Sequence, residues 1–259
     1  MPYETLLLER ADRVATLTLN RPQALNALSP QMVEEFHSAL EEVEGDASLR
    51  ALVVRGAGRA FCAGADLTFF ETAFDDRPAL SAYLTRFNEA LHRLEALPLP
   101  TIAVVHGFAL AGGLEVLLAC DLALAAEDAR LGDQHINFAL MPGGGSTQRL
   151  PRRIGMQRAL ELMLTGRWLS GREAAEWGLV LRAAPPDRLE AEVGALLAAL
   201  RDKSREALGW IKGAALKGRD LPLREGTAYE RWAFVEYCTT SAHPREGLRA
   251  FREKRQPKF

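Results

Sequence analysis

The sequence predicts an α/β fold in which a core of alternating strands and helices is followed by a region of helices alone. Up to about residue 185, apolar runs of strand length alternate with amphipathic runs of helix length. After Pro185-Pro186, every run has helical periodicity. With 259 residues, the chain can form one sizeable domain or a core with a smaller appendage. We therefore expect an α/β core over residues 1–185 and a helical region over residues 186–259.

Composition and charge set broad limits on function. Hydrophobic residues at 48% and charged residues at 25% are typical of a soluble globular protein. A formal net charge of −2 gives no indication of a nucleic-acid or membrane surface. Cys62, Cys120 and Cys238 lack metal-ligand spacing, which favours free thiols in a reducing compartment. The first residues lack a secretory pattern and no apolar run is long enough to span a bilayer, so we expect a cytoplasmic protein.

The N-terminal segment has the pattern of a hairpin followed by a helix. Residues 3–9 and 14–19 are rich in Leu, Val and Thr and flank a short charged turn. Pro22 ends the second strand because proline cannot donate a hydrogen bond to a sheet. Ser29-Pro30 is a typical helix start, with a serine cap and proline at the first helical position.

The next segment alternates between strands and helices around a loop of small residues. Apolar residues predict strands over 51–55 and 102–105, and amphipathic periodicity predicts a helix over 80–97. The small residues of 61–67 indicate that backbone approaches another segment or a ligand closely. The mixed residues of 68–78 predict an excursion over the surface.

The remainder of the core and the C-terminal region follow the same reasoning. We expect strands over residues 122–125, 130–133 and 179–182. We expect helices over residues 156–164, 170–177, 187–200, 205–217, 222–239 and 245–254.

The stretch from Val105 to Gln148 carries the first indication of chemistry. Gly112-Gly113 opens a predicted helix, and Glu115 lies in its first turn. The first N–H groups of a helix have no partner within it and lie at the positive end of the helix dipole. Such a start can stabilise a developing oxyanion. The alternative is a packed strand-to-helix turn in which the helix dipole stabilises the glutamate by roughly 0.3–1 kcal/mol.

Four motifs occur in an order and spacing that resemble one family. They are Asn20-Arg21-Pro22 with Leu25-Asn26-Ala27-Leu28, Phe61-Cys62-Ala63-Gly64-Ala65-Asp66-Leu67, Gly107 to Glu115 with Asp121, and Pro142-Gly143-Gly144-Gly145 with Thr147-Gln148-Arg149-Leu150. Together they resemble the crotonase (enoyl-CoA hydratase/isomerase) superfamily, and the resemblance covers essentially the whole chain. It implies a spiral of ββα units with a helical trimerisation region over 186–259, assembled as homotrimers or dimers of trimers.

The resemblance also implies a substrate and a way of binding it. The substrate is expected to be an acyl-CoA thioester, with coenzyme A as part of the substrate and with no metal or separate cofactor. Matching positions place the two backbone N–H groups that bind the thioester carbonyl on Ala65 and Gly112. Residues expected to bind the substrate or its CoA are Ala24, Leu25, Ala63, Ala65, Asp66, Leu67 and Thr68, with Phe251 and Lys254 near the C-terminus.

The proton chemistry is where the sequence departs from the family. Glu115 matches one of the two acids with which hydratases position and deprotonate water. His135 stands where the second glutamate is expected, with Asp133 two residues earlier. Imidazole exchanges protons near neutral pH, so His135 is a candidate acid or base. The alternative is a polar residue that merely lines the cleft.

Other functions and other residues remain as alternatives. A histidine at position 135 also resembles the superfamily branch that hydrolyses C–C bonds, but that branch pairs it with an aspartate where this chain has Gly144. A third alternative is a non-catalytic acyl-CoA-binding or RNA-binding relative.

Several conspicuous residues are interpreted as structural. We expect packing roles for Cys62 and His106, and core or subunit contacts for Trp210 and Trp232. The glycines of 143–145 lack the Lys-Ser/Thr of a phosphate loop and predict a tight turn.

Overall fold

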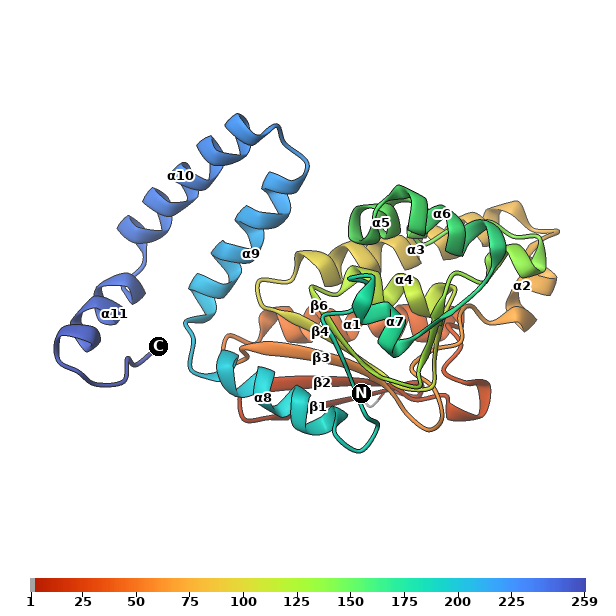
Figure 1. Cartoon of the computed structure of the whole chain (residues 1–259), viewed down its shortest axis with the longest axis horizontal. Helices are drawn as coiled ribbons and strands as arrows, with labels where there is room; N and C mark the ends of the chain where they lie inside the picture. Colours follow the sequence, from red (N-terminus) through yellow and green to blue (C-terminus); the bar gives the residue numbers. More distant parts are fainter. Residues whose placement is uncertain (1–2) are drawn as a thin grey trace.

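The computed structural model describes residues 3–259 and has two sheets flanked by helices (Figure 1). The first two residues, which include the start of the predicted core, lie outside the described part. The larger sheet contains, in spatial order, β1 (Leu6–Ala11), β2 (Val14–Leu19), β3 (Ala51–Gly56), β4 (Thr101–Val105), β6 (Leu122–Ala126) and β9 (Arg182–Ala184). The smaller sheet contains β5 (Phe108–Leu110), β7 (Arg130–Gly132) and β8 (Leu169–Ser170).

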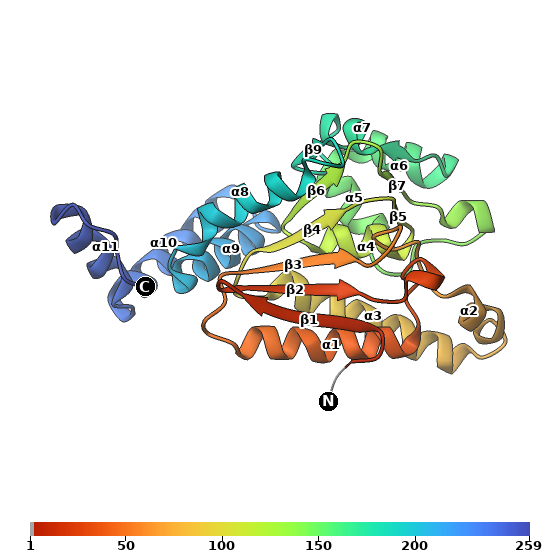
Figure 2. The same ribbon diagram turned by 90° about the horizontal axis from the view of Figure 1, so that it is seen from below.

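The predicted N-terminal hairpin is confirmed, and the strands after it join in parallel. β1 pairs antiparallel with β2, and β2, β3, β4, β6 and β9 then pair in parallel. Parallel strands need crossover connections, and those of the larger sheet carry helices. The crossovers include α1 (Pro30–Gly45), α3 (Arg77–Ala96) and α4 (Gly112–Ala119). Figure 2 shows α1 and α3 lying side by side along the sheet.

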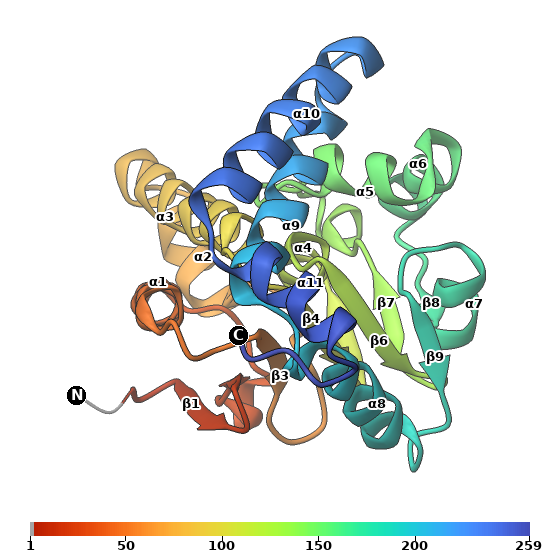
Figure 3. The same ribbon diagram turned by 90° about the vertical axis from the view of Figure 1, so that its left-hand side faces the viewer.

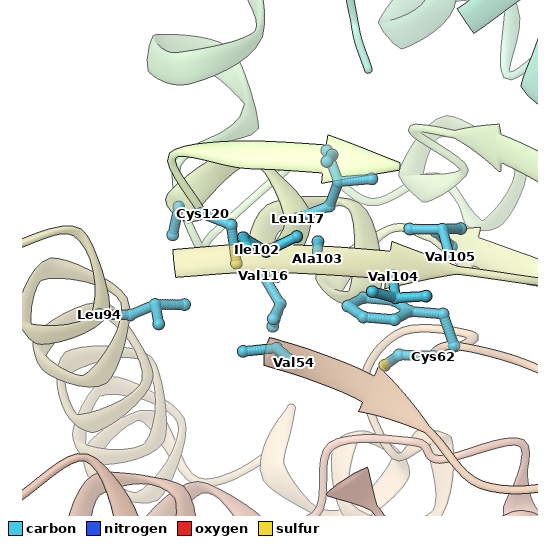
Figure 4. Packing of buried hydrophobic residues seen from close by; sticks show 14 of the residues in the cluster. Val54, Cys62, Leu94, Ile102, Ala103, Val104, Val105, Val116, Leu117 and Cys120 are labelled. Carbon is cyan, nitrogen blue, oxygen red and sulfur yellow. The ribbon is translucent and has the colours of Figure 1, made fainter. Parts of the chain in front are cut away.

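The core sits where the central strands meet α3 and α4. β4 is buried along its whole length, as expected for a parallel strand covered on both faces. Figure 4 shows Ile102 of β4 with Val54 of β3, Leu94 of α3 and Val116 of α4, all of them buried. This packing fixes β4, which continues through β5 to Gly112, and the helix that carries Glu115.

Helix starts were predicted well where a cap marks them. Ser29 Oγ accepts a hydrogen bond from Met32 N at 3.2 Å and α1 begins at Pro30, as expected. The glycine pair does open α4.

The structure adds two helices to the expected elements and shortens one strand. The segment 68–78, expected as an excursion over the surface, is mostly exposed, but it contains most of α2 (Leu67–Ala73), because the Asp66 carboxylate accepts a hydrogen bond from the N–H of Thr68 at 3.1 Å. Helix α5 (Ser146–Ile154) follows the glycine turn and was not predicted. The strand expected over 179–182 begins only at Arg182, because the N–H groups of Leu179 and Val180 bond to Ala174 O and close α7 (Gly171–Glu176).

The remaining helices divide between the core and a projecting arm. α6 (Met156–Thr165) flanks the core, and α8 (Leu189–Arg201) packs on β3, β6 and β9. Helices α9 (Arg205–Arg219), α10 (Leu223–Thr240) and α11 (His243–Arg252) form an arm that extends away from the sheet (Figure 1). Figure 3 views the molecule from the side of this arm, with α9 and α11 in front of the sheet. Within residues 3–259, no helix is both long enough and apolar enough to cross a membrane.

Candidate active site

A cavity of about 750 Å³ brings together most of the residues that the sequence singles out. Its walls come from α2 and α3 on one side and from α4, the loop after β7 and the glycine turn on the other. The predicted residues that line it are Ala24, Ala63, Ala65, Asp66, Leu67, Gly112, Glu115 and His135. These residues come from four separate segments, so the cavity exists only in the folded chain.

Four predicted binding residues do not line this cavity. Leu25 and Thr68 lie next to lining residues, and the N–H of Thr68 is used in the cap of α2. Phe251 and Lys254 lie in or just after α11, at the opposite end of the molecule from α2 (Figures 1 and 2). Within one copy of the chain, these two residues cannot reach a ligand in the cavity.

The backbone amides of Ala65 and Gly112 lie close together in the cavity wall. Leu28 pairs with the segment around Ala65 through Leu28 N to Gly64 O at 2.9 Å and Asp66 N to Leu28 O at 3.2 Å, which leaves Ala65 N out of the pairing. Gly112 is the first residue of α4, so its N–H has no acceptor within the helix. A Cβ added to Gly112 would lie 3.4 Å from Ala65 N. Within residues 3–259, neither amide donates to a protein acceptor.

The residue before Gly112 has a strained backbone conformation, which sets the orientation of the Gly112 N–H. Ala111 has φ 48° and ψ −116°, a region that side-chain-bearing residues avoid at a cost on the order of 1–3 kcal/mol. Its N–H donates to Gly132 O at 3.0 Å, which ties the turn to β7. Gly113 packs so closely on Cys62 O that no side chain fits there. The glycine pair is therefore required by close approach as well as by the helix start.

Glu115 is buried and held by the glycine turn. Its side chain lies in the first turn of α4 and its residue is 2% exposed. Oε1 accepts hydrogen bonds from Gly144 N at 2.8 Å and Ser146 N at 3.1 Å. Burial raises the pKa of Glu115, and the nearby charge of His135 and the two N–H donors offset this shift only in part. Glu115 is thus a carboxyl group poised to exchange a proton.

The glycine turn explains why position 144 carries no side chain. A Cβ on Gly144 would clash with Glu115 Oε2 and with the ring of Phe87. The tight turn predicted over 143–145 is confirmed. It places the N–H groups of Gly144 and Ser146 within hydrogen-bond distance of the Glu115 carboxylate.

His135 is paired with the carboxylate of Asp133, which the sequence places two residues earlier but to which it assigns no role. His135 begins a short 3₁₀ turn (His135–Phe138), and its Nδ1 lies 2.8 Å from Asp133 Oδ1. Burial lowers the pKa of His135, but the hydrogen bond and charge of Asp133, together with the charge of Glu115, outweigh it and raise the pKa. The Asp-x-His spacing was visible in the sequence, but only the turn brings the two side chains together.

Aromatic residues of the cavity were also missed. Phe70 of α2 and Tyr83 and Phe87 of α3 line it, and Tyr83 donates to Leu28 O at 2.9 Å. The spacing of residues 83 and 87 on one helix face was the available indication. They make part of the cavity wall apolar, and Phe87 lies beside Glu115 at the glycine turn.

The residues interpreted as structural lie where that interpretation expects them. Cys62 is buried, and burial raises the pKa of its thiol to about 12, so it is not a nucleophile at neutral pH. His106 Nε2 lies 2.9 Å from Gly58 O. Trp210 and Trp232 contact each other in the arm. Among residues 3–259, no three His, Cys, Asp or Glu side chains are grouped to hold a metal ion.

Comparison with known proteins decides the family. The family model described as enoyl-CoA hydratase/isomerase matches residues 9–259. The chain belongs to this family. It is 41% identical over 259 residues to a probable enoyl-CoA hydratase of Mycobacterium tuberculosis, with 100% of this chain and 99% of that protein covered. It is 35% identical over 265 residues to the crotonyl-CoA hydratase of Syntrophomonas wolfei, with 100% and 99% covered.

Solved structures of family members have the same fold. An enoyl-CoA hydratase from Bacillus anthracis superposes with a TM-score of 0.93 at 36% identity, and the match covers 99% of each chain. A second, from Geobacillus kaustophilus, gives a TM-score of 0.91 at 40% identity, with 100% of this chain and 99% of that chain covered. The predicted crotonase-like α/β fold with C-terminal helices is therefore confirmed.

Proposed function

We propose that the protein is an enoyl-CoA hydratase, which adds water across a C=C bond conjugated to the thioester carbonyl of an acyl-CoA. One observation carries the proposal: the cavity of this family member has two amides without an acceptor in residues 3–259, and the Glu115 and His135 side chains line the same cavity. The family model is named for isomerases as well, which shift a C=C bond along the acyl chain. Both reactions place negative charge on the thioester oxygen, but hydration adds the oxygen of water to the β-carbon, whereas isomerisation only moves a proton between the α- and γ-carbons.

The amides of Ala65 and Gly112 would bind the thioester oxygen. When water attacks the β-carbon, electrons of the C=C bond move toward the carbonyl, and the oxygen gains negative charge. Donors fixed in advance at that position stabilise the enolate without reorganisation. Removal of one such donor costs about 3–4 kcal/mol in comparable sites.

Glu115 and His135 would move the protons. The Glu115 carboxylate accepts a proton from the attacking water, so hydroxide oxygen bonds to the β-carbon. The His135 imidazolium then donates its proton to the α-carbon as the enolate collapses. One proton leaves water and one arrives at carbon, and a proton passes from Glu115 back to His135 to complete the cycle.

The C–C hydrolase alternative conflicts with the glycine turn. That chemistry was expected to need an aspartate at position 144, but any side chain there would displace Glu115 and Phe87. The site is therefore built around Glu115, which favours hydration over C–C hydrolysis.

We also propose that the arm joins copies of the chain into a homotrimer or a dimer of trimers. Large apolar side chains are exposed along α9, α10 and α11: Ile211, Leu223, Trp232, Phe234, Val235, Leu248 and Phe251. A partner that covered them would remove apolar area from water. In such an assembly, Phe251 and Lys254 would bind the CoA of a neighbouring copy. The division of function at residue 185 and the cytoplasmic location remain predictions from the sequence.

Sedimentation equilibrium tests the assembly. We expect a mass of three or six chains for the wild type and smaller species for Phe234→Asp, which places a charge on the exposed face. A monomeric wild type would overturn this part of the proposal.

The activity is tested by the absorbance of the conjugated thioester. We expect the wild type to bleach it with at least one member of a panel of enoyl-CoAs. Glu115→Gln and His135→Ala should each slow the reaction by about 10²–10⁴-fold, the usual contribution of an acid or base. No bleaching with any substrate would reject hydration. Two variants as fast as the wild type would reject the proton assignment.

A further inference from the structure

One buried carboxylate beside His135 has no part in the proposed reaction. Asp133 follows β7, and its residue is fully buried. Its Oδ1 lies 2.8 Å from His135 Nδ1 and also accepts from the backbone N–H of His135 at 3.4 Å. Asp133 is not among the residues that line the cavity. It therefore contacts His135 from behind.

The burial of Asp133 is costly as it stands. Its second oxygen, Oδ2, is buried and has no hydrogen-bond partner within residues 3–259. An unsatisfied buried acceptor costs free energy, and a buried carboxylate costs more than a neutral group of the same size. An apolar or amide side chain of similar size would fill the same space. The buried carboxylate therefore indicates an electrostatic role toward the ring of His135, which it contacts.

The contact determines which nitrogen of His135 faces the substrate. A carboxylate only accepts hydrogen bonds, so Nδ1 must carry a proton. The backbone N–H of His135 fixes Oδ1 in place, which holds the ring in one orientation. Nε2 has no protein partner within residues 3–259 and belongs to a side chain that lines the cavity. Nε2 is then the nitrogen that exchanges protons.

We propose that Asp133 is a positioning residue, which keeps Nδ1 of His135 protonated and presents Nε2 as the proton donor to the substrate α-carbon. In that step the Nε2–H bond breaks, the Cα–H bond forms, and the Nδ1–H bond to Asp133 remains. A buried carboxylate and an imidazole thus act as one unit at the position of the second glutamate. This inference rests on the proposed hydratase function.

The other charged groups near His135 leave this assignment intact. Glu115 faces it from α4 and adds to the raised pKa of His135. Asp66 and Tyr83 also line the cavity, but both are engaged elsewhere. Asp66 pairs with an arginine at 2.8 Å, and the hydroxyl of Tyr83 donates to Leu28 O at 2.9 Å.

Helix α6, which packs against the 3₁₀ turn, brings two further charges. Arg158 bonds to Trp177 O at 3.2 Å and Glu161 pairs with Arg167 at 2.9 Å, so both are engaged elsewhere. Among residues 3–259, Asp133 is thus the one carboxylate within hydrogen-bond distance of the ring.

Nitrogen-15 NMR of the histidine rings tests the inference without requiring turnover. The chain has five histidines, and the signals of His135 are identified by their loss in His135→Gln. In the wild type, we expect the neutral ring to be protonated at Nδ1. In Asp133→Asn, we expect the titration midpoint of His135 to fall by about one pH unit or more, since an opposite charge in contact has been removed.

A matched control removes a carboxylate that is outside the cavity. Asp121 accepts from Thr101 N at 2.8 Å and pairs with Lys212 Nζ at 2.8 Å, so its role is structural. Asp121→Asn should leave the midpoint of His135 and the pH profile of turnover unchanged. Asp133→Asn should lower kcat on the order of 10²-fold with little change in KM, and should move the high-pH limb of turnover to lower pH.

The outcomes separate the two proposals. A neutral wild-type ring protonated at Nε2 would overturn the inference with no variant needed, as would an unchanged midpoint in Asp133→Asn. The expected ring behaviour without any turnover of enoyl-CoAs would instead reject the proposed function and leave Asp133 with no reaction to serve.

Discussion

The two halves of the cavity use different parts of the chain. In the binding half, Ala65 and Gly112 contribute backbone amides, so only the size of their side chains matters. In the proton half, Glu115 and His135 contribute side chains, each held by further groups behind it. The binding half should therefore fail when bulk is added, whereas the proton half should fail when charge or pH changes. The variants below test that difference.

Among variants that keep the Glu115 and His135 side chains, the largest effect is expected from bulk in the binding half. In Gly112→Val, the new side chain would occupy space beside Ala65 N and Leu28 Cδ1. Loss of the oxyanion contacts should lower kcat by at least about 10²–10³-fold. Gly194→Val is the control, since a Cβ there meets nothing within 4 Å. Both variants are compared by steady-state kinetics with an enoyl-CoA. Equal kcat values for the two would contradict the assignment of the Gly112 N–H as an oxyanion donor.

A smaller effect should follow from displacing Glu115 without changing it. Gly144→Ala pushes on Glu115 Oε2 and on Phe87, so the carboxylate loses its place against the glycine turn. We expect kcat to fall by about 10–100-fold, as for other losses of supporting contacts. Binding of a saturated acyl-CoA, measured by calorimetry, should change little because the amides are untouched. Gly45→Ala, with open space around its Cβ, should leave kcat as in the wild type.

The pH dependence should come from the proton half alone. Burial raises the pKa of Glu115, so the required carboxylate is lost as pH falls through that raised value. The Asp133 contact outweighs burial and raises the pKa of His135, so the imidazolium is lost as pH rises through it. We expect a bell-shaped profile of kcat/KM that falls about tenfold per pH unit on each side. Glu115→Gln should abolish the low-pH limb, and a flat wild-type profile would count against both roles.

The smallest effect is on stability. Because the pKa of Glu115 is raised on folding, the folded chain binds that proton more tightly than the unfolded chain does. Its contribution is favourable below the unfolded value of about 4.3 and is lost as pH rises toward the raised folded value. Glu115→Gln avoids that loss, so its melting temperature should exceed that of the wild type at pH 8, by about 2–4 °C per kcal/mol. At pH 4 the difference in melting temperature between variant and wild type should be smaller than at pH 8. A larger difference at pH 4 would contradict the raised pKa of Glu115.

The sequence predicted those features that depend on local chemistry. The serine cap of α1 and the glycine start of α4 were correct because both depend on neighbouring residues. Helix α5 was missed because Pro151 interrupts the usual helical pattern. The family resemblance, not periodicity, supplied the roles of Ala65 and Glu115.

The features that could not be predicted from the sequence depend on tertiary contacts. The Asp133–His135 contact could not be predicted because it depends on a 3₁₀ turn of four residues with no strong pattern of its own. Phe251 and Lys254 cannot be placed on the substrate from one chain, because the arm that carries them points away from the cavity.

Mass spectrometry of an enoyl-CoA incubated in H₂¹⁸O tests the central claim most directly. Hydration predicts one product, an intact acyl-CoA heavier than the substrate by one H₂¹⁸O, with the label on the acyl group. Glu115→Gln and His135→Ala should form it far more slowly. Cleavage into two fragments, one of which carries the ¹⁸O, a product of unchanged mass, or no reaction with any chain length would each contradict the account.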